Sequence, residues 1–388
     1  MLLSNLYSLP GWEKVNILIE EEKISSVSKH TDSLPGVSNS VDIKFEDAIV
    51  FPGLINSHDH LDYNSFPQLG NKVYNDYVEW GVDIHKQNKD VINKVLKIPR
   101  ELRIQWGIYK NLLNGITTVV NHGPKLQVNN DLITVWQECH TLHSVQLEKK
   151  WKIKLNLPFI KKQVFAVHAG EGTDAWAEKE IDELIKWNLF KRELIGIHAI
   201  AMNKKQAEKF KAIVWCPDSN YFLIGKTAAI NELKNKTKIL FGTDSALSAK
   251  WNLWEHLRLA RQEKMIGDNE LFDALTANAA NIWGMSGCGS IVKNNSADVV
   301  IARRKKGLNG MDSFFALNTE DILMVMHKGQ IVLFDDEILS QLSNVGILLD
   351  DFHKIAINGI GKYVLGNLPE LIKAIREYYP EVTFPVTC

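Results

Sequence analysis

The chain has 388 residues, with 45 Lys and Arg against 46 Asp and Glu, and a formal net charge of −1 at pH 7. This balance excludes a bulk electrostatic attraction to nucleic acid or to anionic lipid, so we expect a small-molecule partner. The length suits one large α/β domain with an accessory domain, or two ordinary domains.

The cysteines and the N-terminal segment predict a cellular location. The four cysteines lie far apart, without a C-x-x-C pair or a disulfide framework: Cys139, Cys216, Cys288 and Cys388. The N-terminal segment lacks a basic start followed by a long apolar run, and no uninterrupted apolar stretch reaches about 18 residues. We therefore expect reduced thiols and a cytoplasmic protein that is neither secreted nor inserted in a membrane.

The first part of the chain and a later part both predict β structure. Residues 1–50 contain the β-type segments VNILIE and ISSVS, which indicate a small antiparallel sheet. Residues 288–345 contain SADVVIARR and ILMVMHKGQIVLFD, whose Lys-Gly centre predicts a hairpin. The two parts could join, because the ends of an inserted domain often meet. The composition of residues 346–388 predicts a C-terminal helical extension.

Between these parts, in residues 51–287, short apolar runs alternate with segments of helical periodicity. The runs are VFPGLINS, GITTVVNHG, QVFAVHAGEG, ELIGIHAIAM, AIVWCPDSN and KILFGTDSA. In TDAWAEKEIDELIKWNLF the apolar residues recur at spacings of roughly three and four, which predicts a helix. Strands that alternate with helices predict a parallel sheet.

Residues able to bind metal or to move protons stand at or just after the ends of several runs. They are His58, His60, His168, Glu171, His198 and Asp244. In a parallel α/β barrel the carboxyl ends of the strands meet at one mouth, where the active site lies. Because side chains alternate along a strand, His58 and His60 can point together while Asp59 points away.

Each of these residues also has an ordinary structural explanation. A single histidine after an apolar run is more often a hydrogen-bonded structural residue. Asp244 could cap the helix that follows it, and Glu171 could be a first-turn acid favoured by the helix dipole. We favour one shared functional site, because these separate explanations would all have to coincide at strand ends.

The motifs PGLINSHDH, GITTVV, HAGE, IHA, CPDSN, GTDSALS, TANAANIWG and SADVVIA occur in this order. From about residue 15 to 345 the chain thereby resembles the amidohydrolase superfamily. The resemblance implies a distorted (β/α)8 TIM-like barrel over residues 51–287. It also implies a β-sandwich built from residues 1–50 and 288–345.

The resemblance further implies a metal site and a set of catalytic roles. The implied ligands are His58, His60, His168 and Asp244. Such a set suits one divalent ion, Zn or Fe, which would provide a metal-bound hydroxide. Asp244 would accept the proton of the water and Glu171 would deliver one to the leaving nitrogen. His198 would polarise the substrate or stabilise developing charge.

The number of metal ions depends on a candidate bridging residue. Two-metal relatives use a carboxylated lysine at the end of strand four, and Lys154 in WKIKLNLPF is the candidate here. Lys154 and His168 are so close in the sequence that a helix and the next strand would fit only tightly between them. The H-x-x-E pattern from His168 to Glu171 also resembles the single-metal deaminase branch, so we expect one metal.

The stretch from VWCPDSNYF to NLWEHLRLA resembles deaminases that act on nucleoside-type or free N-heterocyclic amines. Asp218 stands where many of those sequences have Arg. The segment 115–168 is short for strands two to five, which predicts a missing helix or a displaced strand, and a pocket that is open or closed by a partner subunit. Candidate substrate-binding residues are Asp62, Tyr63, Asn64, Trp176 and Asn220, and further pocket candidates are Ser245 and His122.

Three hypotheses follow from these observations. The first is a hydrolytic deaminase of a purine, pterin, pyrimidine or nucleoside-type substrate, which releases ammonia. The second keeps the same site but opens a cyclic amide ring, as imidazolone-type hydrolases do. The third, motivated by the short 115–168 segment, is a non-catalytic scaffold. The resemblance also allows for a homodimer, and the exact substrate stays open.

Overall fold

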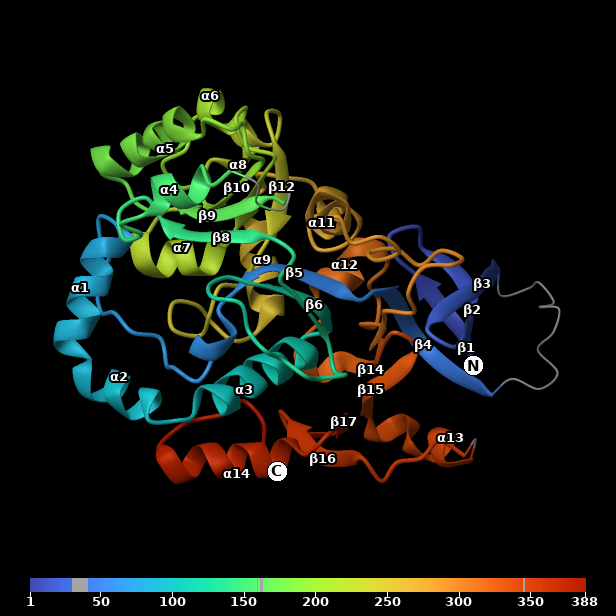
Figure 1. The fold of residues 1–388 in the computed structure, drawn as a ribbon. Coiled ribbons are helices and arrows are strands. Elements are labelled where there is room, and N and C mark those ends of the chain that lie inside the picture. The colour runs from blue at the N-terminus through green and yellow to red at the C-terminus, as the bar shows by residue number, and fades with distance from the viewer. Residues whose placement is uncertain (30–40, 159, 161–162, 345) are drawn as a thin grey trace.

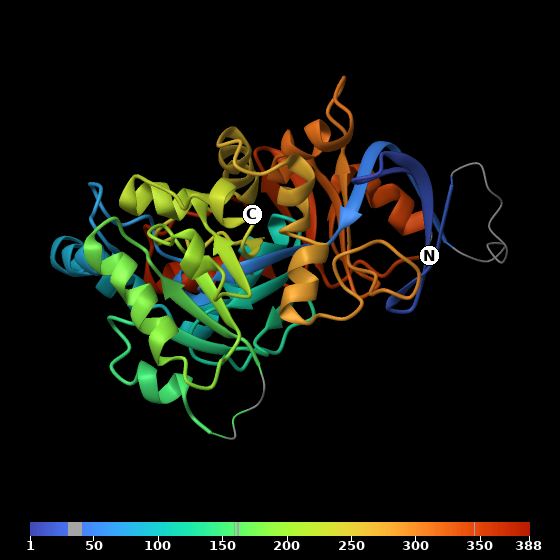
Figure 2. The same ribbon diagram turned by 90° about the horizontal axis from the view of Figure 1, so that it is seen from above.

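The computed structural model describes residues 1–29, 41–158, 160, 163–344 and 346–388. Their strands form one nine-stranded sheet and two smaller sheets of five and three strands, in a mixed α/β fold. The nine-stranded sheet lies on one side of the molecule and the smaller sheets on the other (Figures 1 and 2). Every helix in the described part of the chain is too short or too polar to span a bilayer.

The nine-stranded sheet joins the first part of the chain to the last, because β4 pairs antiparallel with β13. Its order is β16-β17-β15-β14-β13-β4-β1-β2-β3. The hairpin predicted at Lys-Gly is confirmed, since His327 of β14 pairs with Gln330 of β15. The strands are β1 (Leu2–Ser8), β2 (Glu13–Glu20), β3 (Lys23–Lys29), β4 (Asp42–Pro52), β13 (Val299–Arg303), β14 (Ile322–His327), β15 (Gln330–Asp335), β16 (Phe352–Ile357) and β17 (Ile360–Leu365).

The helical extension predicted for residues 346–388 is wrong for its first half. That half forms the β16–β17 hairpin, which extends the nine-stranded sheet, and only α14 (Leu368–Tyr378) is a long helix. The turn is Asn358-Gly359, and both residues have positive φ (49° and 80°). Asn-Gly is a strong hairpin signal, so composition alone obscured a local motif that the sequence contains.

The two smaller sheets consist of parallel strands, as predicted. Their orders are β5-β6-β7 and β12-β11-β10-β9-β8, so neighbours in space are neighbours in the chain. The strands are β5 (Leu54–Asp59), β6 (Ile116–Asn121), β7 (Thr134–Trp136), β8 (His140–Ser144), β9 (Phe165–Ala169), β10 (Leu194–His198), β11 (Ala212–Trp215) and β12 (Lys238–Phe241).

The helices lie mostly between these strands. They are α1 (Tyr77–Gln87), α2 (Lys89–Leu96), α3 (Arg100–Leu113), α4 (Trp151–Leu155), α5 (Ala175–Trp187), α6 (Lys204–Ala207), α7 (Pro217–Ile224), α8 (Ile230–Leu233), α9 (Leu253–Gln262), α10 (Asp268–Asp273), α11 (Ala277–Trp283), α12 (Gly310–Phe315) and α13 (Leu339–Asn344). No helix connects β6 to β7 or β7 to β8, all of whose connecting residues are described. This accounts for the shortness of the 115–168 segment.

Lys154 does not lie at a strand end, because WKIKL forms helix α4. Its Nζ lies 2.9 Å from a carboxylate oxygen of Glu148 at the surface, with about half of the lysine side chain exposed. A lysine held there is not placed to bridge two metal ions at the ends of the parallel strands.

Strand β5 is held in place by one apolar core, which includes residues at the end of β4 and at the start of β5. Phe51, at the end of β4, packs edge to face against Trp254 of α9 and Phe314 of α12. Leu54, the first residue of β5, belongs to the same buried cluster and is fully shielded from solvent. Burying each such side chain contributes about 1.5–3 kcal/mol. The residues that end β5 are therefore anchored rather than presented on a free loop.

Candidate metal centre and pocket

Several strand ends bring polar side chains to one point. His58 lies in β5, and His60 follows this strand directly. His168 lies in β9 and His198 ends β10. Asp244 follows β12, and its backbone N–H donates to the carbonyl oxygen of His58 over 3.0 Å.

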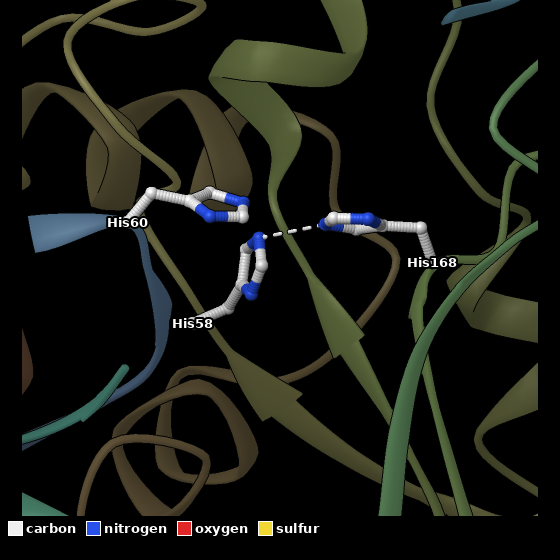
Figure 3. Close-up of side chains that lie close together, drawn as sticks. All are labelled: His58, His60 and His168. Atoms are coloured by element: carbon white, nitrogen blue, oxygen red, sulfur yellow. Dashed lines mark hydrogen bonds between the residues drawn. The ribbon is translucent and has the colours of Figure 1, made fainter. Parts of the chain in front are cut away.

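The side-chain atoms of these residues stand at distances that suit a shared cation. The Nε2 atoms of His58 and His168 lie 3.3 Å apart (Figure 3). Asp244 Oδ1 lies 3.6 Å from His58 Nε2 and 3.8 Å from His60 Nε2. Ligands arranged tetrahedrally around zinc at its usual bond lengths are separated from one another by about 3.4 Å. Ligand atoms of His58, His60 and His168 all lie within 4.8 Å of one another, as do those of His58, His198 and Asp244.

Gly242 permits the close approach of β12 to β5. A Cβ at this position would lie 2.8 Å from the Cβ of His58, a separation that real Cβ atoms essentially never show. His198 and Asp244 both adopt left-handed backbone conformations, with φ of 69° and 56°. Such conformations are unfavourable for residues other than glycine and concentrate at functional sites. The glycine and the strained residues together aim the carboxylate at the imidazoles.

His60, His168 and His198 are uncharged at neutral pH. Burial lowers the pKa of His60 to about 4 and that of His198 to about 4, and neighbouring imidazoles contribute in the same direction. Burial lowers the pKa of His168 well below its ordinary value, with His122 and His58 adding to the effect. The neutral imidazole is the form that binds a metal ion.

Asp244, by contrast, is held as a carboxylate. Burial alone would raise its pKa, but the hydrogen bond and charge of His58, together with His60, outweigh burial and keep the pKa well below its ordinary value. Its Oδ2 accepts from the hydroxyls of Ser219 at 2.8 Å and Ser248 at 2.7 Å. Donors of this kind favour the charged form and leave Oδ1 facing the histidines.

Glu171 carries the opposite protonation state in the same pocket. Burial raises its pKa well above the ordinary value, and the nearby carboxylates of Asp244 and Glu180 raise it further. Its Oε2 lies 3.5 Å from Nε2 of His198. A carboxyl group that keeps its proton near neutral pH can act as a general acid.

His198 is oriented by a buried amide. Its Nδ1 lies 2.9 Å from Oδ1 of Asn220, and Nδ2 of Asn220 donates to the hydroxyl of Thr227 over 3.1 Å. This chain assigns the proton to Nδ1 and leaves Nε2 turned toward Glu171. Asn220 therefore positions His198, and it is not among the residues that line the pocket described below.

Behind the histidines, Asp59 occupies a separate buried network. Its Oδ2 lies 3.1 Å from Nζ of Lys110 and accepts from Nδ2 of Asn111 at 2.8 Å, and its Oδ1 accepts from Nδ2 of Asn64 at 2.8 Å. Lys110 also donates to the backbone oxygen of Asp244 over 3.2 Å. Asp59 does point away from the pocket, and it ties β5 to α3 and to the turn after β12.

A pocket with a volume of about 260 Å³ opens from the histidines toward α1 and α2. Its inner end is formed by His60, His168, Glu171, His198 and Asp244. Tyr63 lines it and stacks on His60, with ring centroids 5.5 Å apart. Ser245, a further candidate, also lines it.

Four of the five proposed substrate-binding residues lie away from the described pocket lining, which corrects those expectations: Asn220, as stated above, and Asp62, Asn64 and Trp176. Asp62 pairs with Arg100 over 2.8 Å. Asn64 donates to Asp59 and accepts from the backbone N–H of Ala246. Trp176, at the start of α5, is 40% exposed.

Two further histidines lie near the site: His122 was a pocket candidate from the sequence, and His143 was not. His143 lines the pocket, and its ring lies 5.3 Å from that of His168. His122, which ends the run GITTVVN, has its ring 4.5 Å from that of His168 and is buried beside the cluster. The short strand HTLHS has no long apolar run before His143, so the strand-end signal that identified the other histidines was absent.

Comparisons with known proteins agree with this geometry. Residues 161–332 match the model of the amidohydrolase family. The chain is 22% identical to a 5-methylthioadenosine/S-adenosylhomocysteine deaminase of Caldicellulosiruptor saccharolyticus, over 84% of this chain and 90% of the relative. Its fold is similar to that of Helicobacter pylori aminofutalosine deaminase in complex with methylthio-coformycin, with a TM-score of 0.66 and 14% identity over 85% of this chain and 99% of that one.

A second solved structure has the same fold and contains metal. An adenosine deaminase from Xanthomonas campestris with bound zinc has a TM-score of 0.65 and 14% identity, and covers 89% of this chain and 96% of its own. Identities this low establish the fold, while the family match adds the motifs that surround His168, His198 and Asp244. The part of the chain that carries His168, His198 and Asp244 is thus similar to the amidohydrolase family.

Proposed function

We propose that His58, His60, His168 and Asp244 hold one divalent metal ion, Zn or Fe. The fit rests on the positions of the ligand atoms, which face one another at distances of 3.3 to 3.8 Å. It also rests on the uncharged imidazoles of His60 and His168 and on the ionised carboxylate of Asp244. Neutral imidazoles with a carboxylate are a donor set that suits these ions. A single ion is favoured because Lys154, the candidate bridge to a second one, pairs with Glu148 at the surface.

The function that this site supports best is hydrolytic deamination of an N-heterocyclic amine. When bound, a divalent ion supplies Lewis acidity and lowers the pKa of water. In this proposal Asp244 Oδ1 accepts a proton from the attacking water, and Glu171 delivers its own proton to the leaving nitrogen. His198 Nε2, fixed through Asn220, stabilises charge that develops on the substrate.

One observation carries this proposal. The pocket contains a buried carboxyl group, Glu171, and a buried carboxylate, Asp244, beside the same histidines. Hydrolysis of a C–N bond needs a group that gives a proton and another that takes one, and two carboxyl groups in unlike environments provide both. A scaffold protein would have no use for this pairing, and deaminases among the relatives support the reaction class.

We further propose that the parallel strands β5 to β12, which follow one another in chain order, form the wall of a distorted (β/α)8 barrel over residues 51–287. The nine-stranded sheet would then be the counterpart of the expected β-sandwich of residues 1–50 and 288–345. The similarity to amidohydrolase structures supports this reading. A cytoplasmic location and a homodimer stay predictions.

The test is ammonia release by purified protein loaded with Zn or Fe. The panel contains adenosine derivatives, including 5′-methylthioadenosine, and purines, pterins and cytosine analogues. We expect ammonia from at least one nucleoside-type or heterocyclic amine. Mass spectrometry separates deamination from ring opening, because ring opening adds water without loss of nitrogen. No ammonia from any member of the panel, with metal demonstrably bound, would rule out the proposed reaction.

A further inference from the structure

The outer part of the pocket is apolar. There α1 and α2 contribute the apolar side chains of Trp80, Ile84, Ile92 and Leu96 and the imidazole of His85, and Leu147 also lines the pocket. No lysine or arginine is among the described residues that line the pocket. Its acidic residues are the two at the inner end, which serve the proposed reaction.

Burial changes along this apolar wall. Ile84 and Ile92 are buried, whereas Leu96 and Leu147 are each 51% exposed. Apolar side chains that line a pocket and remain half exposed gain free energy when a ligand covers them. The wall therefore offers its largest gain to an apolar group that lies over Leu96 and Leu147.

Two arginines close to the pocket are engaged with Asp62. Arg100 pairs with the carboxylate of Asp62 over 2.8 Å, and Nη1 of Arg103 donates to the backbone oxygen of Asp62 over 2.8 Å. Neither arginine lines the pocket. A phosphate or carboxylate placed against the apolar side chains would lose water without gaining a lysine or arginine of the pocket lining as a partner, which is unfavourable.

We propose that the substrate is an uncharged heteroaromatic amine that carries an apolar substituent, such as an alkyl or thioether group. The amine-bearing ring lies at the histidines, and the substituent lies against Trp80, Ile84, Leu96 and Leu147. Nucleotides and substrates that end in an amino-acid group are poor ligands. This inference rests on the proposed deaminase function and narrows it to one substrate class.

The preference for an apolar substituent can be tested by measuring the affinities of two matched ligands, without any need for turnover. Adenine bearing a hexyl group on N9 and adenine bearing a carboxypentyl group on N9 have substituents of similar length and differ in charge. Calorimetry on the metal-loaded protein is expected to show at least about 30-fold tighter binding of the hexyl compound. Equal affinity, tighter binding of the carboxylate, or no binding of either would overturn the inference.

The rates of deamination of an uncharged and a charged substrate provide a second test of the preference for an apolar substituent. 5′-Methylthioadenosine and S-adenosylhomocysteine share base, ribose and thioether, and only the second ends in a charged amino-acid group. We expect a kcat/KM ratio of about 100 in favour of 5′-methylthioadenosine. Ammonia from both at equal kcat/KM would overturn the inference and leave the deaminase function standing. If the hexyl compound binds tightly but no heteroaromatic amine is deaminated, the reaction fails while the ligand preference holds.

A positive charge introduced at Leu147 tests whether the substituent of the substrate lies against this residue. Leu147→Lys changes a half-exposed side chain and is expected to shift the ratio of the two adenine affinities by about fivefold toward the carboxylate. Leu189→Lys is the matched control, since Leu189 is 65% exposed and lies outside the pocket lining. An unchanged ratio in Leu147→Lys, or an equal shift in the control, would contradict the placement of the substituent.

Discussion

The buried ionisable groups on the two sides of the end of strand β5 have different surroundings. On the pocket side, His58 and His60 face other imidazoles and one carboxylate, and burial keeps His60 uncharged. On the opposite side, Asp59 is fully buried with a lysine and several amide donors around it. The same three consecutive residues thus contribute to the proposed metal-ligand set on one side and to a saturated hydrogen-bond network on the other.

This difference shows how the protein separates function from stability within one strand. A saturated network holds its members in place, because removal of any partner leaves a buried polar group unsatisfied. The proposed metal ligands on the other side would instead be held together by the ion that binds them. Lys110 connects the two sides, since it pairs with Asp59 and also donates to the backbone oxygen of Asp244.

The largest expected effect comes from breaking the pocket side. Glu171→Gln removes the proton donor and keeps the ligands, so kcat/KM should fall about 10²- to 10⁴-fold while the metal content is unchanged. His168→Ala should lose both metal and activity. Metal analysis beside steady-state kinetics distinguishes the two variants. Retention of activity within tenfold in Glu171→Gln would remove Glu171 from the proposed mechanism.

Substitutions in the buried network around Asp59 should reduce the free energy of unfolding more than they reduce activity. Asp59→Ala leaves the ammonium of Lys110 buried without its counter-ion, and we expect the free energy of unfolding to fall by about 3–5 kcal/mol. The double variant Asp59→Asn, Lys110→Met should recover most of that loss. Asp62→Ala is the control, because its partner Arg100 is 41% exposed and the loss should be below about 1 kcal/mol. Urea denaturation measures all three.

Glu180 is a buried carboxyl group on α5 without a basic partner among the described residues, and it differs from both Asp244 and Asp59. Its Oε1 accepts from the backbone N–H of Gly170 over 2.8 Å, and burial raises its pKa to about 7 from 4.5. The folded state therefore binds the proton more tightly than the unfolded state. The stability this contributes is fully present below about pH 4.5 and is lost as pH rises through about 7, a change of roughly 3 kcal/mol.

Urea denaturation at pH 5 and pH 8 checks this prediction by comparison with Glu180→Gln. The amide cannot ionise, so the variant should lack this part of the pH dependence. Equal changes of the unfolding free energy between the two pH values, in variant and parent, would show that Glu180 does not titrate in this range.

The smallest effect is expected at Trp176, which sequence reasoning assigned to the pocket. It lies on the outer surface of α5 with Nζ of Lys179 5.0 Å from its ring centroid. Trp176→Ala should change KM less than twofold and stability by less than about 0.5 kcal/mol. Tyr63→Ala, which removes a residue that does line the pocket, is the comparison variant, and a larger effect on KM at Trp176 than at Tyr63 would reverse the assignment.

Residues at strand ends could be predicted because the signals for them are local. A short apolar run marks a buried strand, and the period of two separates His58 and His60 from Asp59. The parallel arrangement then brings the ends of β5, β9, β10 and β12 together without knowledge of any loop. The Lys-Gly hairpin was predictable for the same reason, since its turn chemistry lies within a few residues.

The partners of the site residues and the lining of the pocket depend on packing between segments that are distant in the sequence. Nothing near Lys110 indicates that α3 carries its ammonium to Asp59, and nothing near Leu96 or Leu147 indicates that they meet at one pocket mouth. Trp176 follows Glu171 closely, yet the start of α5 turns its side chain to solvent. The sequence by itself determined the candidate reacting groups and the strands that carry them. Only the tertiary structure decided their partners and the apolar wall, because these follow from which helix faces pack together.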